Sequence, residues 1–375
     1  MDIPICSIKK GTALCRVIQE GKVTVVDEAP MTNKLAFEAL DRTLRDLIGN
    51  NQPMGGMCML LCGDFRQILP VIQGGTRGNI VDACLKKSYL WDHVVVKHLH
   101  TNMRVHLHGD EAAGEFAGQL LTIGDGKYPI DTSPDIIQLP ENIGTFVCTK
   151  DELVSRVYPD LPSNFRNVAW LSERCILAPL NETTRTINTA LLAQLPGDSV
   201  EYRSLDSVPD ESQAVHFPIE FLNSLEVSGF PSHLLTLKLA APIIILRSLD
   251  PPKVTNGTRC VITKLSANTI EARISHGRYA GHNIIIPRIP LIPTNSALPF
   301  EFRRLQFPVV LCFAMTINKS QGQTFKAVGI DLTNESFTHG MLYVALSRVG
   351  SPDCLTLLVR EDRKTRNVVY SEVFN

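Results

Sequence analysis

The sequence predicts an α/β protein with two open sheets and a small all-β domain inserted in the second α/β domain. Three observations support this fold class. Short β-branched runs alternate with helical patterns in the first third of the chain, and the same alternation returns later. Between about Thr236 and Arg304, short strands follow one another without a helical period. The chain has 375 residues, 44% of them hydrophobic and 20% charged, so a sizeable core can be buried.

The first α/β part contains three predicted strands. The run "VTVVDE" (residues 23–28) is short and β-branched, as is typical of a buried parallel strand. The run "MCMLLCGDF" (residues 57–65) predicts a second buried strand, and "VVVKHL" (residues 94–99) predicts a third. Because helical sequence separates the strands, we expect a doubly wound sheet.

A helix is predicted between the first two strands, within "MTNKLAFEALDRTLRDLIGN" (residues 31–50). Thr32 or Asn33 can cap its start, and Gly49 can end it. One face of this helix is apolar and consists of Leu40, Leu44, Leu47 and Ile48.

The second α/β part shows the same alternation. "RCILAP" (residues 174–179) predicts a strand, "NETTRTINTALLAQL" (181–195) a capped helix, and "PVVLCFAMTI" (308–317) and "DCLTLLV" (353–359) further strands. The inserted all-β part consists of the runs "APIIILRSL", "GTRCVITKL", "NTIEARI" and "HNIIIPRIPLI". Turns rich in Gly, Asn and Pro separate these runs, which favours a small barrel.

Composition excludes several classes of protein. The net charge of -1 provides no whole-chain positive field, although nucleic-acid binding needs only a local basic groove. The ten Cys form no C-x-x-C pair, so we interpret them as reduced, mostly buried thiols rather than a disulfide or zinc framework. No apolar run reaches the ~18 residues of a membrane span, and we expect no membrane partner.

Carboxylates follow two of the predicted strands. Asp27 and Glu28 end the first strand, and Asp64 ends the second. At the carboxyl edge of a parallel sheet such groups can hold Mg²⁺ and activate a water molecule. Gln67 lies just beyond the second strand, where an amide can sense a terminal phosphate. The alternatives are a solvated turn for Asp27 and Glu28, and a β-turn with a buried Phe for the stretch that contains Asp64 and Gln67.

The segment "FAMTINKSQGQTF" (residues 313–325) is the most specific part of the chain. Hydroxyl, amide and ammonium groups surround Gly322 at a predicted strand-to-helix turn, which suits contacts to a phosphodiester backbone. The alternative is an ordinary helix N-cap region. Arg104 and Arg348 also follow apolar strands, where a cation could stabilise charge on a phosphoryl group or simply form a surface ion pair.

Seven motifs occur in a fixed order: "VVDEAPM", "LCGDFRQILPV", "NMRV", "ILAPLNETTRTIN", "NGTR", "TINKSQGQTF" and "YVALSRV". Together they closely resemble the Pif-one-like, superfamily-one DNA helicases, which include the helicase portion of Helitron transposons. The resemblance extends from about Ile5 to Val359.

This resemblance implies two RecA-like (P-loop NTPase) domains, the first incomplete here, with an SH3-like β domain inserted in the second. The implied ranges are 1–102 for the partial first domain, 103–235 and 306–375 for the two parts of the second, and 236–305 for the insertion. The implied activity uses ATP and Mg²⁺ to move 5′ to 3′ on single-stranded DNA and to unwind duplex junctions. The resemblance further implies a monomer that acts in repair, recombination, telomere maintenance or transposition. Its implied location is the nucleus, or alternatively the mitochondrion.

The resemblance also implies roles for individual residues. Catalytic roles fall on Glu28, Gln67, Arg104 and Arg348. Nucleotide binding falls on Asp27, Glu28, Gln67, Arg104, Gly322 and Arg348, with Asp27 as the magnesium ligand. DNA contacts fall on Thr316, Asn318, Lys319, Ser320 and Gln321, and on Thr258 and Arg259 of the β domain.

One expected motif does not occur in the sequence, the phosphate-binding loop G-x-x-x-x-G-K-[ST]. We therefore expect the chain to begin beyond that loop, and the first sheet to lack one or more strands and expose apolar edges. The loop normally cradles the β- and γ-phosphates. The alternative hypothesis is a transposon-derived fragment that binds single-stranded DNA without ATP turnover.

Overall fold

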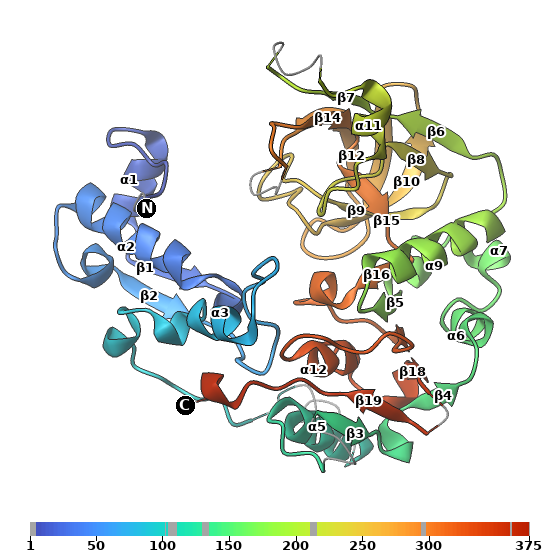
Figure 1. Ribbon diagram of the computed structural model, residues 1–375, viewed down its shortest axis with the longest axis horizontal. Helices are drawn as coiled ribbons and strands as arrows, with labels where there is room; N and C mark the ends of the chain where they lie inside the picture. Colours follow the sequence, from blue (N-terminus) through green and yellow to red (C-terminus); the bar gives the residue numbers. More distant parts are fainter. Residues whose placement is uncertain are drawn as a thin grey trace.

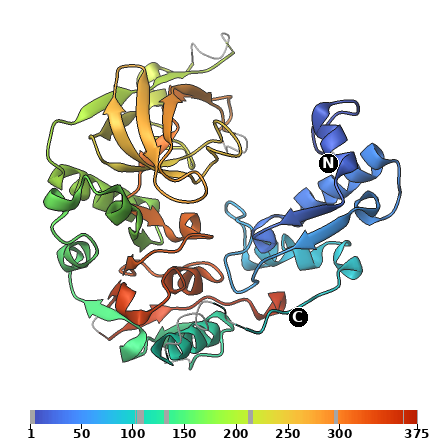
Figure 2. The same ribbon diagram turned by 180° about the vertical axis from the view of Figure 1, so that it is seen from behind.

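The computed structural model describes residues 5–101, 103, 111–129, 135–210, 216–293, 298–360 and 362–374. It contains a first α/β region, a second α/β region and an all-β region (Figures 1 and 2). Within the described residues, none of the helices combines the length and apolar character needed to cross a bilayer.

The first α/β region is built on a parallel strand pair, with Val23 opposite Cys58 and Val26 opposite Leu61. Its elements are α1 (Ala13–Glu20), β1 (Val23–Val26), α2 (Lys34–Ile48), β2 (Cys58–Leu61) and α3 (Arg77–Asp82). Helix α2 begins and ends as predicted. The Asn33 side chain accepts a hydrogen bond from the amide of Leu35, and Gly49 adopts the left-handed conformation (φ 73°).

Two predictions for this region were wrong. Residues 94–101 form no strand, and Val95 and Leu99 are 79% and 100% exposed. A strand requires a hydrogen-bonding neighbour, and the described residues supply only β1 and β2 to this sheet. The two strands are also not buried, because Val23, Val25 and Leu60 are 55%, 61% and 52% exposed. These side chains lie on a face of the strand pair, so the expected exposed edge remains a prediction.

The second α/β region contains a parallel sheet in the order β16-β5-β17-β18-β4. Its strands are β3 (Ile136–Gln138), β4 (Thr145–Val147), β5 (Arg174–Ala178), β16 (Ala314–Thr316), β17 (Ala327–Asp331), β18 (Leu355–Leu358) and β19 (Lys364–Arg366). Its helices are α5 (Glu111–Gly124), α6 (Lys150–Val157), α7 (Leu161–Asn164), α8 (Val168–Ser172), α9 (Asn181–Gln194) and α12 (Met341–Leu346). Helix α9 lacks the predicted side-chain cap, because Leu180 occupies its N-cap position.

The all-β region contains an antiparallel sheet in the order β12-β11-β10-β9-β15 and two smaller strand groups, β13-β14-β7 and β6-β8. Its elements are β6 (Val200–Arg203), β7 (Leu205–Ser207), α11 (Ile219–Ser224), β8 (Leu234–Leu237), β9 (Pro242–Ile245), β10 (Arg259–Leu265), β11 (Thr269–Ile274), β12 (Asn283–Pro287), β13 (Ile289–Leu291), β14 (Arg303–Gln306) and β15 (Val309–Leu311). The antiparallel strands of this region thus run from Val200 to Leu311. The domain ranges given above remain predictions.

The predicted single strand at residues 308–317 is two strands in different sheets. Leu311 of β15 pairs with Ile243 in the all-β region, whereas Ala314 of β16 pairs with Ile176 in the second α/β sheet. The Asn188 side chain fixes the start of β16. It accepts from the amide of Ala314 and donates to its carbonyl, both at 2.8 Å. One continuous strand could not hydrogen-bond in both sheets.

The C-terminal residues 367–374, here called the strap, connect the two α/β regions. The strap follows β19, which pairs with β3, and runs toward the first α/β region (Figure 1). Its side chains Val368, Tyr370 and Val373 are buried in a cluster with Leu69 and Cys84. Apolar burial of this kind holds elements together without directional bonds.

Candidate functional site

The acidic pair lies at the carboxyl end of β1. Asp27 is exposed and Glu28 is half-buried, and the Asp27 carboxylate accepts a 2.9 Å hydrogen bond from the amide of Glu28. Burial raises the pKa of Glu28, and the charges of Asp27 and Asp64 add to this, while Arg348 opposes it. Glu28 therefore lies within the electrostatic reach of Arg348, which comes 320 positions later in the chain and belongs to the second α/β region.

The ends of β1 and β2 are joined directly beyond the strands. The amide of Ala29 donates a 2.9 Å hydrogen bond to the carbonyl of Cys62. At Gly63 any side chain would collide with the Pro30 ring, so this close approach requires glycine. The contact places the Asp27–Glu28 pair beside the turn that carries Asp64.

The turn at residues 64–67 is bound to the second α/β region. Tyr343 of α12 donates a 2.9 Å hydrogen bond to Oδ2 of Asp64. Arg66 forms ion pairs with Asp64 at 3.3 Å and with Asp125, which follows α5, at 2.5 Å. The predicted catalytic turn of one region is thus held by side chains of the other.

Gln67 lies against the start of α12. A side chain at Gly340, the N-cap of this helix, would collide with the carbonyl oxygen of Arg66 and lie 2.7 Å from the carbonyl carbon of Gln67. The side-chain oxygen of Gln67 is buried and has no hydrogen-bond partner among the described residues. A buried amide oxygen normally has one, so this atom is available for a donor that the described residues do not provide.

Arg348 follows α12 and is 7% exposed. Its guanidinium donates to the carbonyl of Val344 at 2.8 Å and to the carbonyls of Ser320 and Gln323 at 3.1 Å each. It therefore organises the segment predicted to contact DNA and also influences the pKa of Glu28. The structure thus places four of the predicted site residues in the same part of the fold: Asp27, Glu28, Gln67 and Arg348. Arg104 lies outside the described residues.

The predicted DNA segment forms a short 3₁₀ helix at Ile317–Ser320 and then a turn. Gly322 adopts the left-handed conformation (φ 71°) and is exposed. Thr316, Asn318 and Lys319 are partly exposed, and burial lowers the pKa of Lys319. These three side chains, the exposed Thr324 and the backbone around Gly322 are therefore among the accessible groups of the segment.

Two predicted DNA-contact side chains face inward. Ser320 is fully buried, and its hydroxyl donates to the carbonyl of Ile317 at 2.7 Å. Both polar atoms of the Gln321 side chain are buried without a partner among the described residues. This geometry does not support a DNA contact by the Ser320 hydroxyl, because the turn uses that group to close itself.

The predicted contact by Arg259 is also not supported. Arg259 is 3% exposed, and its guanidinium donates to the carbonyls of Ser172 at 2.8 Å and Arg174 at 3.1 Å. It lies 4.9 Å from the centroid of the Phe325 ring. Arg259 thus fastens β10 to the second α/β region. Thr258 remains partly exposed and accepts from the amide of Thr255 at 3.0 Å.

Several residues that hold the site were not predicted. Tyr343 lies in the motif "YVALSRV" but was not singled out, and no local sequence signal marks Asp125. His339 is buried and bridges the strap to the turn, because it accepts from the amide of Tyr370 at 2.8 Å and donates to the carbonyl of Phe65 at 2.7 Å. Only the folded chain brings these groups together.

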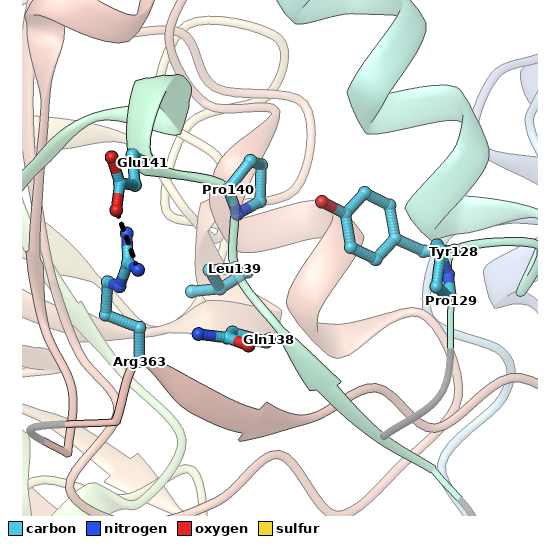
Figure 3. Close-up of a pocket in the computed structure, with 7 residues that line it drawn as sticks. All are labelled: Tyr128, Pro129, Gln138, Leu139, Pro140, Glu141 and Arg363. Carbon is cyan, nitrogen blue, oxygen red and sulfur yellow. Dashed lines mark ion pairs between the residues drawn. The ribbon is translucent and has the colours of Figure 1, made fainter.

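A pocket of about 390 Å³ lies away from this site, on the second α/β region. Figure 3 shows its lining from Tyr128 and Pro129 to the residues after β3, with Arg363 paired to Glu141 at 2.9 Å. Its lining contains none of the predicted site residues. We therefore do not connect this pocket with the predicted chemistry.

The acidic pair has the carboxylates that a Mg²⁺ site requires from the protein. The described residues contain no group of three or more His, Cys, Asp or Glu that could hold a metal ion. Mg²⁺, however, needs only one or two protein carboxylates when water and phosphate oxygens complete its shell. The exposed Asp27 carboxylate beside Glu28 fits that requirement.

Comparison with known proteins shows which family the chain is similar to. A family model described as PIF1-like helicase matches residues 1–134, and one described as the 2B domain of the DNA helicase Pif1 matches residues 220–265. The resemblance to PIF1-like helicases found in the seven motifs is therefore confirmed.

Relatives among curated proteins carry the same name. The chain is 24% identical over 339 residues to the ATP-dependent DNA helicase PIF1 of Xenopus laevis, covering 90% of this chain and 46% of that protein. It is 27% identical to the human protein of that name, covering 89% of this chain and 45% of the relative. The chain thus spans about half the length of the curated relatives it matches.

The fold also matches that of solved PIF1-like helicases. A Bacteroides Pif1 helicase in complex with ADP-AlF3 and single-stranded DNA aligns with a TM-score of 0.63 at 20% identity. The alignment covers 99% of this chain and 79% of that one. The predicted fold class, two RecA-like α/β domains, is confirmed by this match.

Proposed function

We propose that this chain is part of an ATP-dependent DNA helicase that moves 5′ to 3′ along single-stranded DNA and unwinds duplex junctions. The position of Arg348 carries the proposal. Its guanidinium holds the carbonyls of Ser320 and Gln323 in the predicted DNA segment, and its charge reaches Glu28 of the predicted ATP site. One buried cation thereby connects the two sites that a helicase must couple.

In the proposed ATP site, Asp27 holds Mg²⁺, which neutralises phosphate charge when bound. Glu28 is the general base for the attacking water, and a raised pKa makes its carboxylate a better proton acceptor near neutral pH. Gln67 contacts the terminal phosphate or that water, and its side-chain oxygen, which has no partner among the described residues, can accept a hydrogen bond from the water. The curated relatives' name, ATP-dependent DNA helicase, supports this assignment.

In the proposed DNA site, Thr316, Asn318 and Lys319 provide partly exposed hydroxyl, amide and ammonium groups. Such donors bind phosphate oxygens without reading base sequence. Gly322 lets the exposed backbone approach the strand closely. The related Bacteroides structure, which contains single-stranded DNA, supports this partner.

A second function, binding of single-stranded DNA without ATP turnover, is favoured by a different observation. The sheet that carries the 316–324 segment has five parallel strands, whereas the described part of the first region has two. The sequence also contains no G-x-x-x-x-G-K-[ST] loop to cradle the nucleotide phosphates. In this alternative the DNA site works alone.

The test measures ATP turnover and DNA affinity on the same preparation. DNA-stimulated ATPase activity that disappears in Glu28→Gln, but not in the exposed control Glu220→Gln, supports the helicase. Saturable binding of a labelled oligonucleotide without turnover selects the second function. No binding even at low salt contradicts both. Unwinding of substrates with only a 5′ or only a 3′ single-stranded tail then tests the direction.

A further inference from the structure

The turn of residues 64–67 is contacted by helix α12 and by the residue that follows helix α5. Tyr343 of α12 donates to Asp64 at 2.9 Å, across 279 residues of sequence. Arg66 pairs with Asp64 on one side and with Asp125, after α5, on the other. The side chains of Asp64, Arg66 and Asp125 are 26%, 33% and 23% exposed, so water only partly screens these charges.

The packing around this cluster is tight. A Cβ at Gly124 would lie 2.8 Å from Cδ2 of Tyr343 and 2.9 Å from Cδ of Arg66. Gly340 similarly permits α12 to touch the backbone of Arg66. Both contacts exist because glycine has no side chain there. The turn therefore has little freedom to shift against α5 or α12.

The same helix supports two of the proposed catalytic groups. Its N-terminus lies against the backbone of Gln67, and Arg348 follows its C-terminus. Tyr343 lies between them and binds the turn through Asp64. A rigid helix that is bound to the turn moves Gln67 and Arg348 together.

From this geometry we propose that Tyr343 and Asp125 are positioning residues that hold the 64–67 turn on α12, so that Gln67 and Arg348 keep a fixed relation in the ATP site. Neither residue touches the nucleotide in this assignment. The inference rests on the proposed ATPase function for its catalytic consequence. Its structural part, the attachment of the turn, can be tested separately.

The experiment compares Tyr343→Phe and Asp125→Asn with the exposed control Asp353→Asn, using the full chain. Tyr343→Phe removes the hydrogen bond to Asp64, Asp125→Asn removes the negative charge that pairs with Arg66, and both keep the size of the side chain. Amide hydrogen exchange in residues 63–70 is expected to accelerate by about fivefold in both variants, from the weakening of one partly buried contact, while the remaining sheet amides and the control stay unchanged. Unchanged exchange in residues 63–70 overturns the proposal.

The catalytic consequence is measured by comparing the effect on kcat with the effect on KM for ATP. In a chain that hydrolyses ATP, both variants are expected to lower kcat by about tenfold while KM for ATP and the affinity for single-stranded DNA stay within about twofold. Unchanged kcat, or an equal loss of DNA affinity, overturns the positioning role. If the parent chain shows no turnover, the helicase proposal fails, and the exchange result alone decides whether Tyr343 and Asp125 hold the turn.

Discussion

Arg348 and Ser320 lie 28 residues apart, and Nη1 of Arg348 donates a 3.1 Å hydrogen bond to the carbonyl oxygen of Ser320. The same nitrogen donates to the carbonyl of Gln323 at the same distance. Two backbone groups of the predicted DNA segment therefore depend on one buried guanidinium. Disturbing this cation should affect the shape of the segment before it affects any direct contact with DNA.

Replacing Arg348 by Lys tests this relationship. A single ammonium cannot reproduce the planar fork that reaches Val344, Ser320 and Gln323. We expect the free energy of unfolding to fall by about 2–3 kcal/mol, and single-stranded DNA affinity to fall by about tenfold. Urea denaturation and fluorescence anisotropy measure the two effects.

The matched control for this change is Arg360→Lys. The Arg360 side chain is 67% exposed and pairs with Glu335 at 3.7 Å, so its replacement should change stability by less than about 0.5 kcal/mol. Equal behaviour of the two variants would show that the Arg348 fork does not organise the segment.

The pKa of Glu28 predicts a pH dependence of stability. Burial and the neighbouring Asp27 raise this pKa, so the folded protein binds the proton more tightly than the unfolded chain. Its stabilising effect is present at low pH and is lost as pH rises from the ordinary glutamate pKa through the raised one. Across that window, we expect the parent to lose more stability than Glu28→Gln in denaturation curves at stepped pH. A parallel pH dependence, with Glu220→Gln as reference, would contradict the raised pKa.

The buried His339 predicts the opposite pH dependence. Burial lowers its pKa, although the contact with the Phe65 carbonyl partly opposes this. The folded protein therefore resists protonation, and stability should fall as pH decreases through the ordinary histidine pKa of about 6.5. At pH 7 we expect His339→Gln to be less stable by about 2 kcal/mol, because the hydrogen bonds to Phe65 and Tyr370 are disturbed.

Below pH 6.5, the stability difference between His339→Gln and the parent should narrow, because the variant has no imidazole to protonate. Thermal unfolding at several pH values measures this narrowing. The exposed His216→Gln serves as the control, and it should follow the parent at every pH. A constant difference would show that His339 remains protonatable in the fold.

The ion pair between Arg304 and Asp206 predicts a large loss of stability. Both side chains are fully buried, and the pair is bidentate at 2.9 and 2.7 Å. Arg304→Met should cost about 3–5 kcal/mol, because it leaves the Asp206 charge buried without its partner. The neighbouring exposed Arg303→Met is the control, and the double variant with Asp206→Leu should recover part of the loss. Chemical denaturation that shows equal stability for both single variants would contradict this role.

Local sequence was sufficient for many elements of the fold. The apolar periodicity and the Asn33 and Gly49 signals predicted α2, a β-branched run predicted β1, and short apolar runs predicted β2 and β5. The motif order also indicated the family and pointed to Asp27, Glu28, Gln67 and Arg348. The predictions of helices and strands succeed because periodicity and capping depend on residues within a few positions of one another, whereas the roles of these four residues remain predictions.

The tertiary structure decided what depends on distant partners. It divided residues 308–317 between two sheets, left residues 94–101 without a strand partner, and turned Arg259 and Ser320 inward. It also placed Tyr343 on Asp64 and the strap on the first α/β region. The sequence by itself determined which elements form and which chemical groups end the strands. Only the fold determined which of these groups are buried or paired, because burial and hydrogen bonding are set by residues hundreds of positions away.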